Sequence, residues 1–532
     1  MDIHELSNSE PTVADDAHQL TSPPWEQILE KVCAIAAVSS LTVSCILISS
    51  KKEIWVDECY ALQVVTDASL RHMLYALAHG VDGGMPLYYL IAHGGSLIFG
   101  STLLSLRVLS SLLISSGMIV LWRAMRRSYS LLATSLGVPA VLLGSPLVLN
   151  QNAELRFYGL FFLCGAIVLA LDSRLSEGKS GRKLVTSAVV AHAALLLSHV
   201  FGVLYSGASI GALVLCDYRK GKLRCNLYAA LLSSWILLLL WIKPVLRIYD
   251  IGHPHNWIPP LNLVTTAKFM GALSVGFWIG LVLCALVALL TAARNSSVPV
   301  PATNVMLCQA FAYLLVPAAV AAISLGGGLS LFLDRYFLPS VSGLAIILVC
   351  LLDWVLPRVP HSTLSRAGVG LLLLTSFAWP IYKGLATPHI VTMEWLNRGL
   401  AGDLPIIVED ANTFLPLIYY APSQPAYYYA LDWESAIRSQ SLHATVQSKL
   451  MRNAKSVGYH SDRILEAREA QCAFESFVVL DSPGISWFED RIANDSAFDV
   501  QKLGDLGFGD PGPAHIWLVR RLYRSPECFH PA

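Results

Sequence analysis

The sequence predicts a polytopic α-helical membrane protein of about eleven spans, followed by a soluble domain at its carboxyl end. The 532-residue chain is 55% hydrophobic and only 14% charged, with a mean hydropathy of +0.55. Soluble domains carry about 25% charged residues. Apolar runs of bilayer-spanning length recur up to residue 387, and beyond residue 388 the composition becomes that of a soluble domain.

The amino-terminal segment, residues 1–30, is polar and acidic. It lacks the basic start of a signal peptide, so we expect a disordered cytoplasmic tail of about 25 residues. The formal net charge is zero and no basic patch is interleaved with aromatic residues, so we expect no nucleic-acid partner. Most cysteines lie inside apolar runs, without a metal-binding spacing. Cys472 and Cys528 are the two that could pair in an oxidising compartment.

Apolar runs mark the expected spans in chain order. They fall at 31–50, 108–123, 130–149, 158–173, 184–200, 203–217, 227–246, 268–292, 305–325, 336–356 and 367–386. Together these spans, residues 31–387, form the expected transmembrane domain.

Basic loops fix the expected orientation of these spans. "RAMRRSYS", "DSRLSEGKSGRK", "DYRKGKLR" and "PRVPHSTLSR" fall on alternate sides of the spans in one register, and the positive-inside rule makes that side cytoplasmic. The first outer loop, 51–107, and the soluble domain, 388–532, are then extracytoplasmic, with 247–267 and 325–335. Lys51 and Lys52 disagree locally, but the summed loops outweigh them.

Segment 86–100, "PLYYLIAHGGSLIFG", is apolar but short. If it spanned the membrane, the register of the basic loops would invert downstream. We therefore expect a re-entrant or interfacial helix on the outer side, which survives at membrane depth only where protein or a water-filled cavity covers it. Arg107 would then open the next span.

The soluble domain, 388–532, is predicted to be an α/β or α+β module. Strands are expected in "DLPIIVED", "ESFVVLD" and "GPAHIWLVRRLY", and helices in "EWLNRGLAG" and "SAIRSQSLHATVQSKLMRNA". The aromatic stretch "YYAPSQPAYYYALDW" fits either carbohydrate contact or packing.

Charged and aromatic residues gather at the outer ends of the expected spans. Asp57 and Glu58 follow the first span within "KKEIWVDECY". The others are Asp82, Tyr88 and Tyr89 in "HGVDGGMPLYYLI", Glu154, Arg156 and Tyr158 in "NAELRFYGL", His199 in "LLLSHVFGVL", and Asp334, Arg335 and Tyr336 in "FLDRYFLPSVSGL".

Each of these residues also has a plain structural interpretation. Asp57 and Glu58 suit a helix start. Arginines and tyrosines at span ends can reach the headgroups, and His199 can stabilise its turn. Taken together, the set favours transfer of a group from a lipid-linked phosphate. Arginines would hold the phosphate, and a carboxylate would take the proton of an incoming hydroxyl.

These motifs resemble the first outer loop and later motifs of the C-type (GT-C) superfamily of membrane glycosyltransferases. The resemblance is greatest to bacterial members related to dolichyl-phosphate-mannose protein mannosyltransferases and lipid A aminoarabinose transferases. It rests on "WVDECYAL", "DGGMPLYYL", Arg107, "ELRFY" (154–158), "SHVFG" (198–202) and "RYFLP" (335–339), and it covers roughly 30–390.

The resemblance implies inverting transfer of a sugar from a polyprenyl-phosphate donor to an acceptor hydroxyl. The reaction would take place on the outer face of a bacterial inner membrane, without a nucleotide cofactor, and the acceptor is a lipid, glycan or protein. The implied roles are catalysis for Asp57 and Glu58, donor-phosphate binding for Arg156, Arg335 and Tyr336, and site lining for Glu154, Tyr158, His199, Tyr88 and Asp82.

The chain departs from the family pattern at one motif. Gly84, Met85 and Pro86 stand where the family usually has His-Pro-Pro, which removes an imidazole, and the nearby His79 is shifted. A divalent cation stays an open possibility, because only Asp57, Glu58 and Glu154 offer ligands together. Alternative functions are a transporter or flippase, a lipid-linked glycan polymerase or ligase, and a membrane-anchored binding module.

Overall fold

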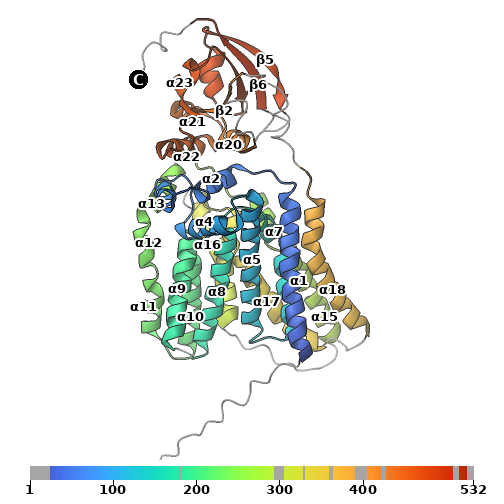
Figure 1. Cartoon of the computed structure of the whole chain (residues 1–532). Coiled ribbons are helices and arrows are strands. Elements are labelled where there is room, and N and C mark those ends of the chain that lie inside the picture. The colour runs from blue at the N-terminus through green and yellow to red at the C-terminus, as the bar shows by residue number, and fades with distance from the viewer. Residues whose placement is uncertain are drawn as a thin grey trace, which may run out of the picture.

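The chain forms a helical bundle with a smaller α/β domain at one end (Figure 1). This computed structural model describes residues 24–178, 181–292, 305–326, 330–358, 363–389, 404–420, 427–506 and 514–523. Residues 1–23 of the expected disordered tail, the helix expected in "EWLNRGLAG" and Cys528 lie outside the described residues. Residues 24–30, also expected to be disordered, are instead the first turns of a helix.

The bundle begins at α1 and ends at α18. Its first half is α1 (Pro24–Ser49), α2 (Val56–Val65), α3 (Leu70–Ala78), α4 (Pro86–Phe99), α5 (Leu103–Met125), α6 (Leu131–Leu143), α7 (Pro146–Asn152), α8 (Tyr158–Ser176) and α9 (Arg182–Ser198). Its second half is α10 (Gly202–Arg219), α11 (Cys225–Ser233), α12 (Ile236–Leu240), α13 (Ile242–Ile251), α14 (Leu263–Leu273), α15 (Val275–Ala292), α16 (Val305–Gly326), η1 (Asp334–Phe337), α17 (Ser340–Val355), η2 (Leu356–Arg358) and α18 (Thr363–Ala386).

Six described helices are long and apolar enough to cross a membrane, namely α1, α5, α8, α16, α17 and α18. Three bent pairs raise the number to nine if each is one span: α6 with α7 (69°), α11–α12 with α13 (63°), and α14 with α15 (75°). The expected count of about eleven is therefore not confirmed. The two remaining expected spans are helices α9 and α10, which stand beside α8 (Figure 1). Charged residues at the outset of α9 and at the end of α10 shorten their apolar stretches.

Helices α5 and α8 form a tightly packed pair. A Cβ at Gly117 of α5 would lie 2.6 Å from the Phe162 ring and 3.1 Å from the Leu163 backbone, and one at Gly159 of α8 would lie 2.8 Å from the Ser110 carbonyl oxygen. Small residues let membrane helices approach in this way. The pair therefore holds the amino-terminal part of α5 against the start of α8.

Helix α4 is the expected short helix in segment 86–100. Its 14 residues begin with Pro86 at the first helical turn, where a missing N–H costs nothing. The helix lies at the end of the bundle that faces the smaller domain and packs against α2, α5 and α9 (Figure 1). A Cβ at Gly95 would lie 2.7 Å from the Leu109 side chain, so glycine permits the contact with α5.

The smaller domain is built on one mixed sheet, which confirms the predicted strand–helix alternation. Its strands are β1 (Ile406–Val408), β2 (Tyr427–Leu431), β3 (Ile464–Glu466), β4 (Ser476–Asp481), β5 (Phe498–Leu506) and β6 (Ala514–Arg521), in the order β3-β2-β1-β4-β6-β5. Strands β1 to β4 are parallel, whereas β6 and β5 are antiparallel. The helices are α20 (Ala411–Tyr420), α21 (Trp433–Arg438), α22 (Ala444–Ser456) and α23 (Ala467–Cys472), with one turn of η3 (Glu489–Ala493).

His72 of α3 connects the bundle to the smaller domain. Its Nδ1 faces the Asp67 carboxylate, and its Nε2 lies 2.9 Å from the Val457 carbonyl oxygen of the smaller domain. Tyr459 donates a hydrogen bond to the same carboxylate at 2.5 Å. Both ring nitrogens therefore face acceptors, which only the imidazolium form satisfies. The Asp67 carboxylate first, and then the Val457 carbonyl, raise the pKa of His72.

The raised pKa of His72 predicts pH-dependent stability of the contact between bundle and domain. The stabilisation is complete below the ordinary histidine pKa of about 6.5 and is lost as the pH rises through the raised value. We expect the thermal midpoint of the wild type to fall over this range more steeply than that of His72→Gln. His79→Gln is the matched control, because Nδ1 of His79 bonds the Tyr75 carbonyl within its own helix. Equal pH slopes in wild type and His72→Gln would contradict the prediction.

Candidate active site

Helix α2 presents two consecutive carboxylates in different directions at the end of the bundle. Trp55 precedes the helix in an extended conformation, and Asp57 and Glu58 lie in its first turn. Adjacent helical residues point about 100° apart. Glu58 is consequently fully buried, whereas a quarter of the Asp57 side chain remains exposed. The predicted helix start is confirmed, and it serves to position these two side chains.

Glu58 forms a fully buried ion pair with Arg107 of α5. Arg107 donates from Nε to Glu58 Oε1 at 2.8 Å and from Nη2 to Oε2 at 2.5 Å, and neither side chain is exposed. The guanidinium also binds the carbonyl oxygens of Lys52 and Glu53, and Glu58 accepts the Leu155 N–H at 2.7 Å. The pair therefore connects α2, α5, the linker after α1 and the segment before α8.

Asp57 contacts Arg335, which lies 278 residues further along the chain. Arg335 Nη2 donates to Asp57 Oδ2 at 3.0 Å, and the Arg335 side chain is 15% exposed. Three aromatic rings surround the guanidinium, with centroids 5.1 Å (Trp55), 5.9 Å (Tyr158) and 5.6 Å (Trp257) away. Aromatic faces hold a guanidinium in place while leaving its N–H groups free for an anion.

Arg156 connects Asp57 to Asp82. It donates from Nη1 to the Asp57 carbonyl oxygen and to Asp82 Oδ2, each at 2.8 Å. Nearby, a Cβ at Gly84 would lie 2.4 Å from the Tyr89 hydroxyl. Tyr89 thus occupies the space beside Gly84, in the motif where this chain departs from the family pattern.

Lys51 and Lys52 both bind local partners at the end of the bundle near the smaller domain. Lys52 Nζ pairs with Glu154 Oε1 at 2.7 Å. Lys51 Nζ binds the carbonyl oxygens of Gly384 and Leu385 at 3.1 and 2.7 Å, at the end of α18. Cations are favourable at such helix ends. The two lysines therefore have structural partners and do not overturn the orientation given by the basic loops.

His199 lies among aromatic rings between α9 and α10. Its ring centroid is 5.0 Å from that of Tyr336 and 5.9 Å from that of Tyr158, and its Nδ1 accepts the Phe201 N–H at 3.0 Å. Tyr88 packs nearby against Phe157, whose ring also contacts His199. These residues form an aromatic wall beside Arg335.

Several buried polar atoms around this site have no hydrogen-bond partner within the described part of the chain. Among them are Trp55 Nε1, Glu154 Oε2, Arg156 Nε and Arg335 Nε, and the hydroxyls of Tyr88 and Tyr89. Buried polar groups in native proteins are rarely left unsatisfied. Three of these atoms are N–H donors, two of them on arginines, and an anionic ligand group would complete their hydrogen bonding. Glu154 Oε2 is an acceptor and would need a donor such as a ligand hydroxyl.

The structure thus brings together the residues that the sequence singled out. Asp57, Asp82, Glu154, Arg156, Arg335, Tyr88, Tyr158, His199 and Tyr336 share one chain of contacts, and Glu58 lies directly beneath it. Asp334 does not join this group, because its side chain accepts the backbone N–H of Arg335. Lys52 and Trp257 were missed, since a lysine after a span and a tryptophan in a loop are too common to single out.

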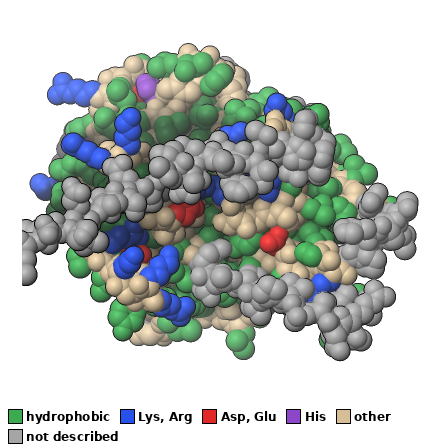
Figure 2. All heavy atoms as spheres, turned by 90° about the horizontal axis from the view of Figure 1, so that it is seen from below, with side chains coloured by type: hydrophobic (Ala, Val, Ile, Leu, Met, Phe, Trp, Pro, Cys, Tyr) green, Lys and Arg blue, Asp and Glu red, His purple; other side chains and the backbone are tan. Residues whose placement is uncertain are grey.

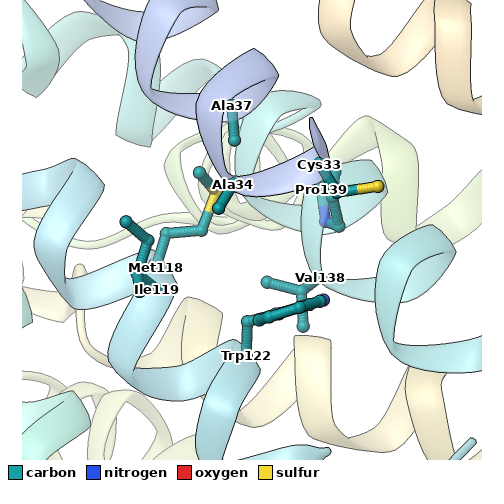
Figure 3. A pocket seen from close by; sticks show the side chains of 8 residues that line it. All are labelled: Cys33, Ala34, Ala37, Met118, Ile119, Trp122, Val138 and Pro139. Atoms are coloured by element: carbon teal, nitrogen blue, oxygen red, sulfur yellow. The ribbon is translucent and has the colours of Figure 1, made fainter. Parts of the chain in front are cut away.

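A small apolar cavity lies elsewhere in the bundle, between α1, α5 and α6 (Figure 3). It is lined by Cys33, Ala34, Ala37, Met118, Ile119, Trp122, Val138 and Pro139. None of these side chains is charged, so this cavity offers no group for phosphate or proton transfer.

Carboxylates that could hold a metal ion lie in the smaller domain. Ligand oxygens of Glu409, Asp481 and Glu489 lie within 4.8 Å of one another. Burial, and then the nearby Asp481, raise the pKa of Glu409 well above its ordinary value. In the bundle, by contrast, Asp57 pairs with Arg335 and the other site carboxylates pair likewise with cations. The sequence did not single out this triad, whose members are separated by long intervals.

One further polar network lies inside the bundle. His192 of α9 contacts Asp172 of α8 at 3.2 Å and Ser206 of α10 at 2.8 Å, and Ser209 donates to Asp172 at 2.7 Å. Gln309 of α16 donates to Ser209 at 2.8 Å. The expectation that the spans are nearly uncharged overlooked this network, whose hydrogen bonds join four helices.

The fold, a helical bundle with a smaller α/β domain at one end, matches that of solved structures. The particular structures that it resembles are those of ArnT from Cupriavidus metallidurans. The apo structure superposes with a TM-score of 0.58 at 12% identity, covering 92% of this chain and 98% of that chain. The structure bound to undecaprenyl phosphate gives 0.55 at 13% identity, covering 93% and 98%. No protein-family model and no curated protein sequence matches the chain.

The buried Glu58–Arg107 pair predicts a large loss of stability when one partner is removed. Glu58→Met or Arg107→Met leaves a buried charge unpaired, which costs about 3–5 kcal/mol. The double variant should be less destabilised than the sum of the two, because it leaves neither charge unpaired. Thermal unfolding of the purified variants in detergent measures this coupling. Additive effects of the two substitutions would show that the pair does not act as a unit.

Proposed function

We propose that this protein is a glycosyltransferase that moves a sugar from a polyprenyl-phosphate donor to an acceptor hydroxyl, with inversion. The observation that carries the proposal is the contact between Asp57 and Arg335 at 3.0 Å, partly exposed among aromatic rings. A carboxylate and a guanidinium suit an acceptor hydroxyl and a donor phosphate respectively. The ArnT structure that holds undecaprenyl phosphate supports a polyprenyl lipid as the donor class.

In the proposed reaction, the donor phosphate binds Arg335 and draws it away from the Asp57 carboxylate. Asp57 then accepts the proton of the acceptor hydroxyl while that oxygen attacks the anomeric carbon of the sugar. The bond from this carbon to the phosphate oxygen breaks, and polyprenyl phosphate leaves with the electron pair. Arg156 holds the Asp57 backbone and offers its unpaired Nε as a second contact for the phosphate.

The remaining residues have supporting roles in this proposal. Tyr336 lies beside the donor phosphate, while Tyr158, His199 and Tyr88 wall the sugar. Glu58 is a positioning residue, because its carboxylate is fully occupied by Arg107 and the Leu155 N–H.

We place the reaction on the extracytoplasmic face of a bacterial inner membrane. The basic loops between α5 and α6, α8 and α9, and α10 and α11 lie at the end of the bundle away from the smaller domain (Figure 1). Viewed from that end, Figure 2 shows clusters of lysine and arginine side chains. Basic loops favour the cytoplasmic side, so the smaller domain would face outward. Labelling of a cysteine introduced at an exposed position of this domain, in intact cells, tests the orientation.

Asp57→Asn is expected to abolish sugar transfer, with a loss of at least about 10²-fold in rate, because the amide cannot accept the proton. Transfer from an undecaprenyl-phosphate sugar, followed with purified protein in detergent, measures the effect. Asp353→Asn is the control, since Asp353 accepts the Ser130 N–H at the far end of the bundle. Wild-type activity in Asp57→Asn would refute the proposed role.

Arg335→Lys is expected to weaken donor binding while keeping the positive charge. A lysine cannot form the two parallel hydrogen bonds that a guanidinium offers to a phosphate. We expect the KM for the donor, and the Kd for undecaprenyl phosphate alone, to rise about tenfold. Arg438→Lys, whose guanidinium pairs with Asp490 in the smaller domain, is the matched control. An unchanged donor dependence would exclude Arg335 as a phosphate ligand.

The alternative functions differ in their products. A lipid-linked glycan polymerase or ligase shares the same chemistry but transfers a long glycan, so product length separates it from a single-sugar transferase. A flippase moves the lipid-linked sugar across a vesicle bilayer and forms no new glycosidic bond.

A further inference from the structure

We propose that the smaller domain positions the active site by holding three separate segments of the bundle at fixed positions relative to one another. Its positioning residues are Tyr420, Lys449 and Asn453. The three segments are 52–58, 78–82 and 250–257. Each one carries a residue of the site described above: Asp57, Asp82 and Trp257. Only the kinetic part of the test below depends on the proposed function.

The first contact holds the segment before α2. The Ile54 N–H donates to the Tyr420 hydroxyl of α20 at 2.9 Å. Ile54 is buried and lies three residues before Asp57. Helix α2 itself packs against α20. The hydroxyl of one residue in the smaller domain therefore satisfies a buried backbone group at the entrance of the helix that carries Asp57.

The second contact holds the turn after α3. Asn453 of α22 donates from Nδ2 to the Gly80 carbonyl oxygen at 3.0 Å. Gly80 has a φ of +75°, a conformation that favours glycine. It lies two residues before Asp82, the partner of Arg156. The amide of Asn453 thus fixes the turn that places Asp82.

The third contact holds the last turn of α13, from which the chain continues to Trp257. Lys449 of α22 donates from Nζ to the Asp250 carbonyl oxygen at 2.7 Å and to its carboxylate at 3.1 Å. This segment leads to Trp257, whose ring stacks on Arg335 and lies 6.1 Å from the His443 ring of the smaller domain. Asp250 therefore links the smaller domain to the aromatic enclosure of Arg335.

One face of α22 makes the last two contacts. Lys449 and Asn453 are four residues apart, and Val457, whose carbonyl faces His72, follows four residues later. Residues at this spacing lie in a row along one side of a helix. The spacing of these three residues along α22 consequently sets the distances between α3, the turn at Gly80 and the segment at Asp250. A rigid helix is a more accurate support than three independent loops.

The test compares Tyr420→Phe, Lys449→Met and Asn453→Ala, singly and combined, with Lys455→Met. Lys455 is on the same helix but pairs with Glu466 and Glu469 inside the smaller domain. Hydrogen exchange of segments 52–58, 78–82 and 250–257 is the first readout, because it requires no enzymatic activity. The kcat and the donor KM for sugar transfer are the second.

We expect faster exchange in the three segments of the combined variant, with wild-type exchange in the sheet of the smaller domain. We expect its kcat to fall about tenfold or more, because small misplacements of reacting groups are costly. The donor KM should rise as well, because loosening segment 250–257 displaces Trp257 from the Arg335 guanidinium. Lys455→Met should match the wild type in both readouts, and Lys449→Arg should restore the contact with Asp250.

Unchanged exchange in the three segments of the combined variant would overturn the proposal. So would faster exchange with unaltered kcat, because the segments would then be held without consequence for the reaction. If the wild type transfers no sugar at all, the proposed function fails, and the exchange data alone still decide whether the domain holds the segments. The two proposals can therefore fail independently.

Discussion

Glu58 and Arg107 form two hydrogen bonds at a point where neither side chain reaches solvent. Taking two charges out of water is expensive, and this cost is offset only when every remaining hydrogen-bonding group is also satisfied. Arg107 achieves this through the carbonyls of the linker after α1, and Glu58 through the Leu155 N–H. The linker, α2, α5 and the segment before α8 thus have one mutual arrangement. Asp57 and Arg156 are placed by that arrangement.

The charges at this end of the bundle form a series that runs from buried to accessible. The Glu58–Arg107 pair is inaccessible, and the pair of Asp82 with Arg156 is nearly so. The pair of Asp57 with Arg335 is partly exposed and keeps an unpaired Nε. The inner pairs can therefore hold the geometry while the outermost pair exchanges its partner for a substrate. If all three ion pairs were equally exposed, binding of a substrate would also break the pairs that hold the site in place.

Much of the site could be predicted because carboxylates, arginines and a histidine gather at the same ends of several apolar spans. Asp57, Arg156 and Arg335 stand out against apolar surroundings, and periodicity located the helices that carry them. The pairing could not be predicted, since nothing in the sequence indicates that Arg335 contacts Asp57 while Arg107 contacts Glu58. Bends of more than 60° within helix pairs such as α6 with α7 were also missed, because hydropathy does not show the direction in which a helix runs. The row of contacts on α22 is made by polar residues that resemble an ordinary solvated helix face.

Lys51 gives the bundle an order of assembly. It stands just after the first membrane helix, α1, and its ammonium group binds the final carbonyls of α18, the last membrane helix. The two helices also pack along their length, and Ser40 donates to the Phe377 carbonyl. During synthesis, the partners of Lys51 are translated more than 330 residues after it. The contact of α1 with α18 can therefore form only after α18 has been translated, whereas the contacts of α1 with α5 can form earlier.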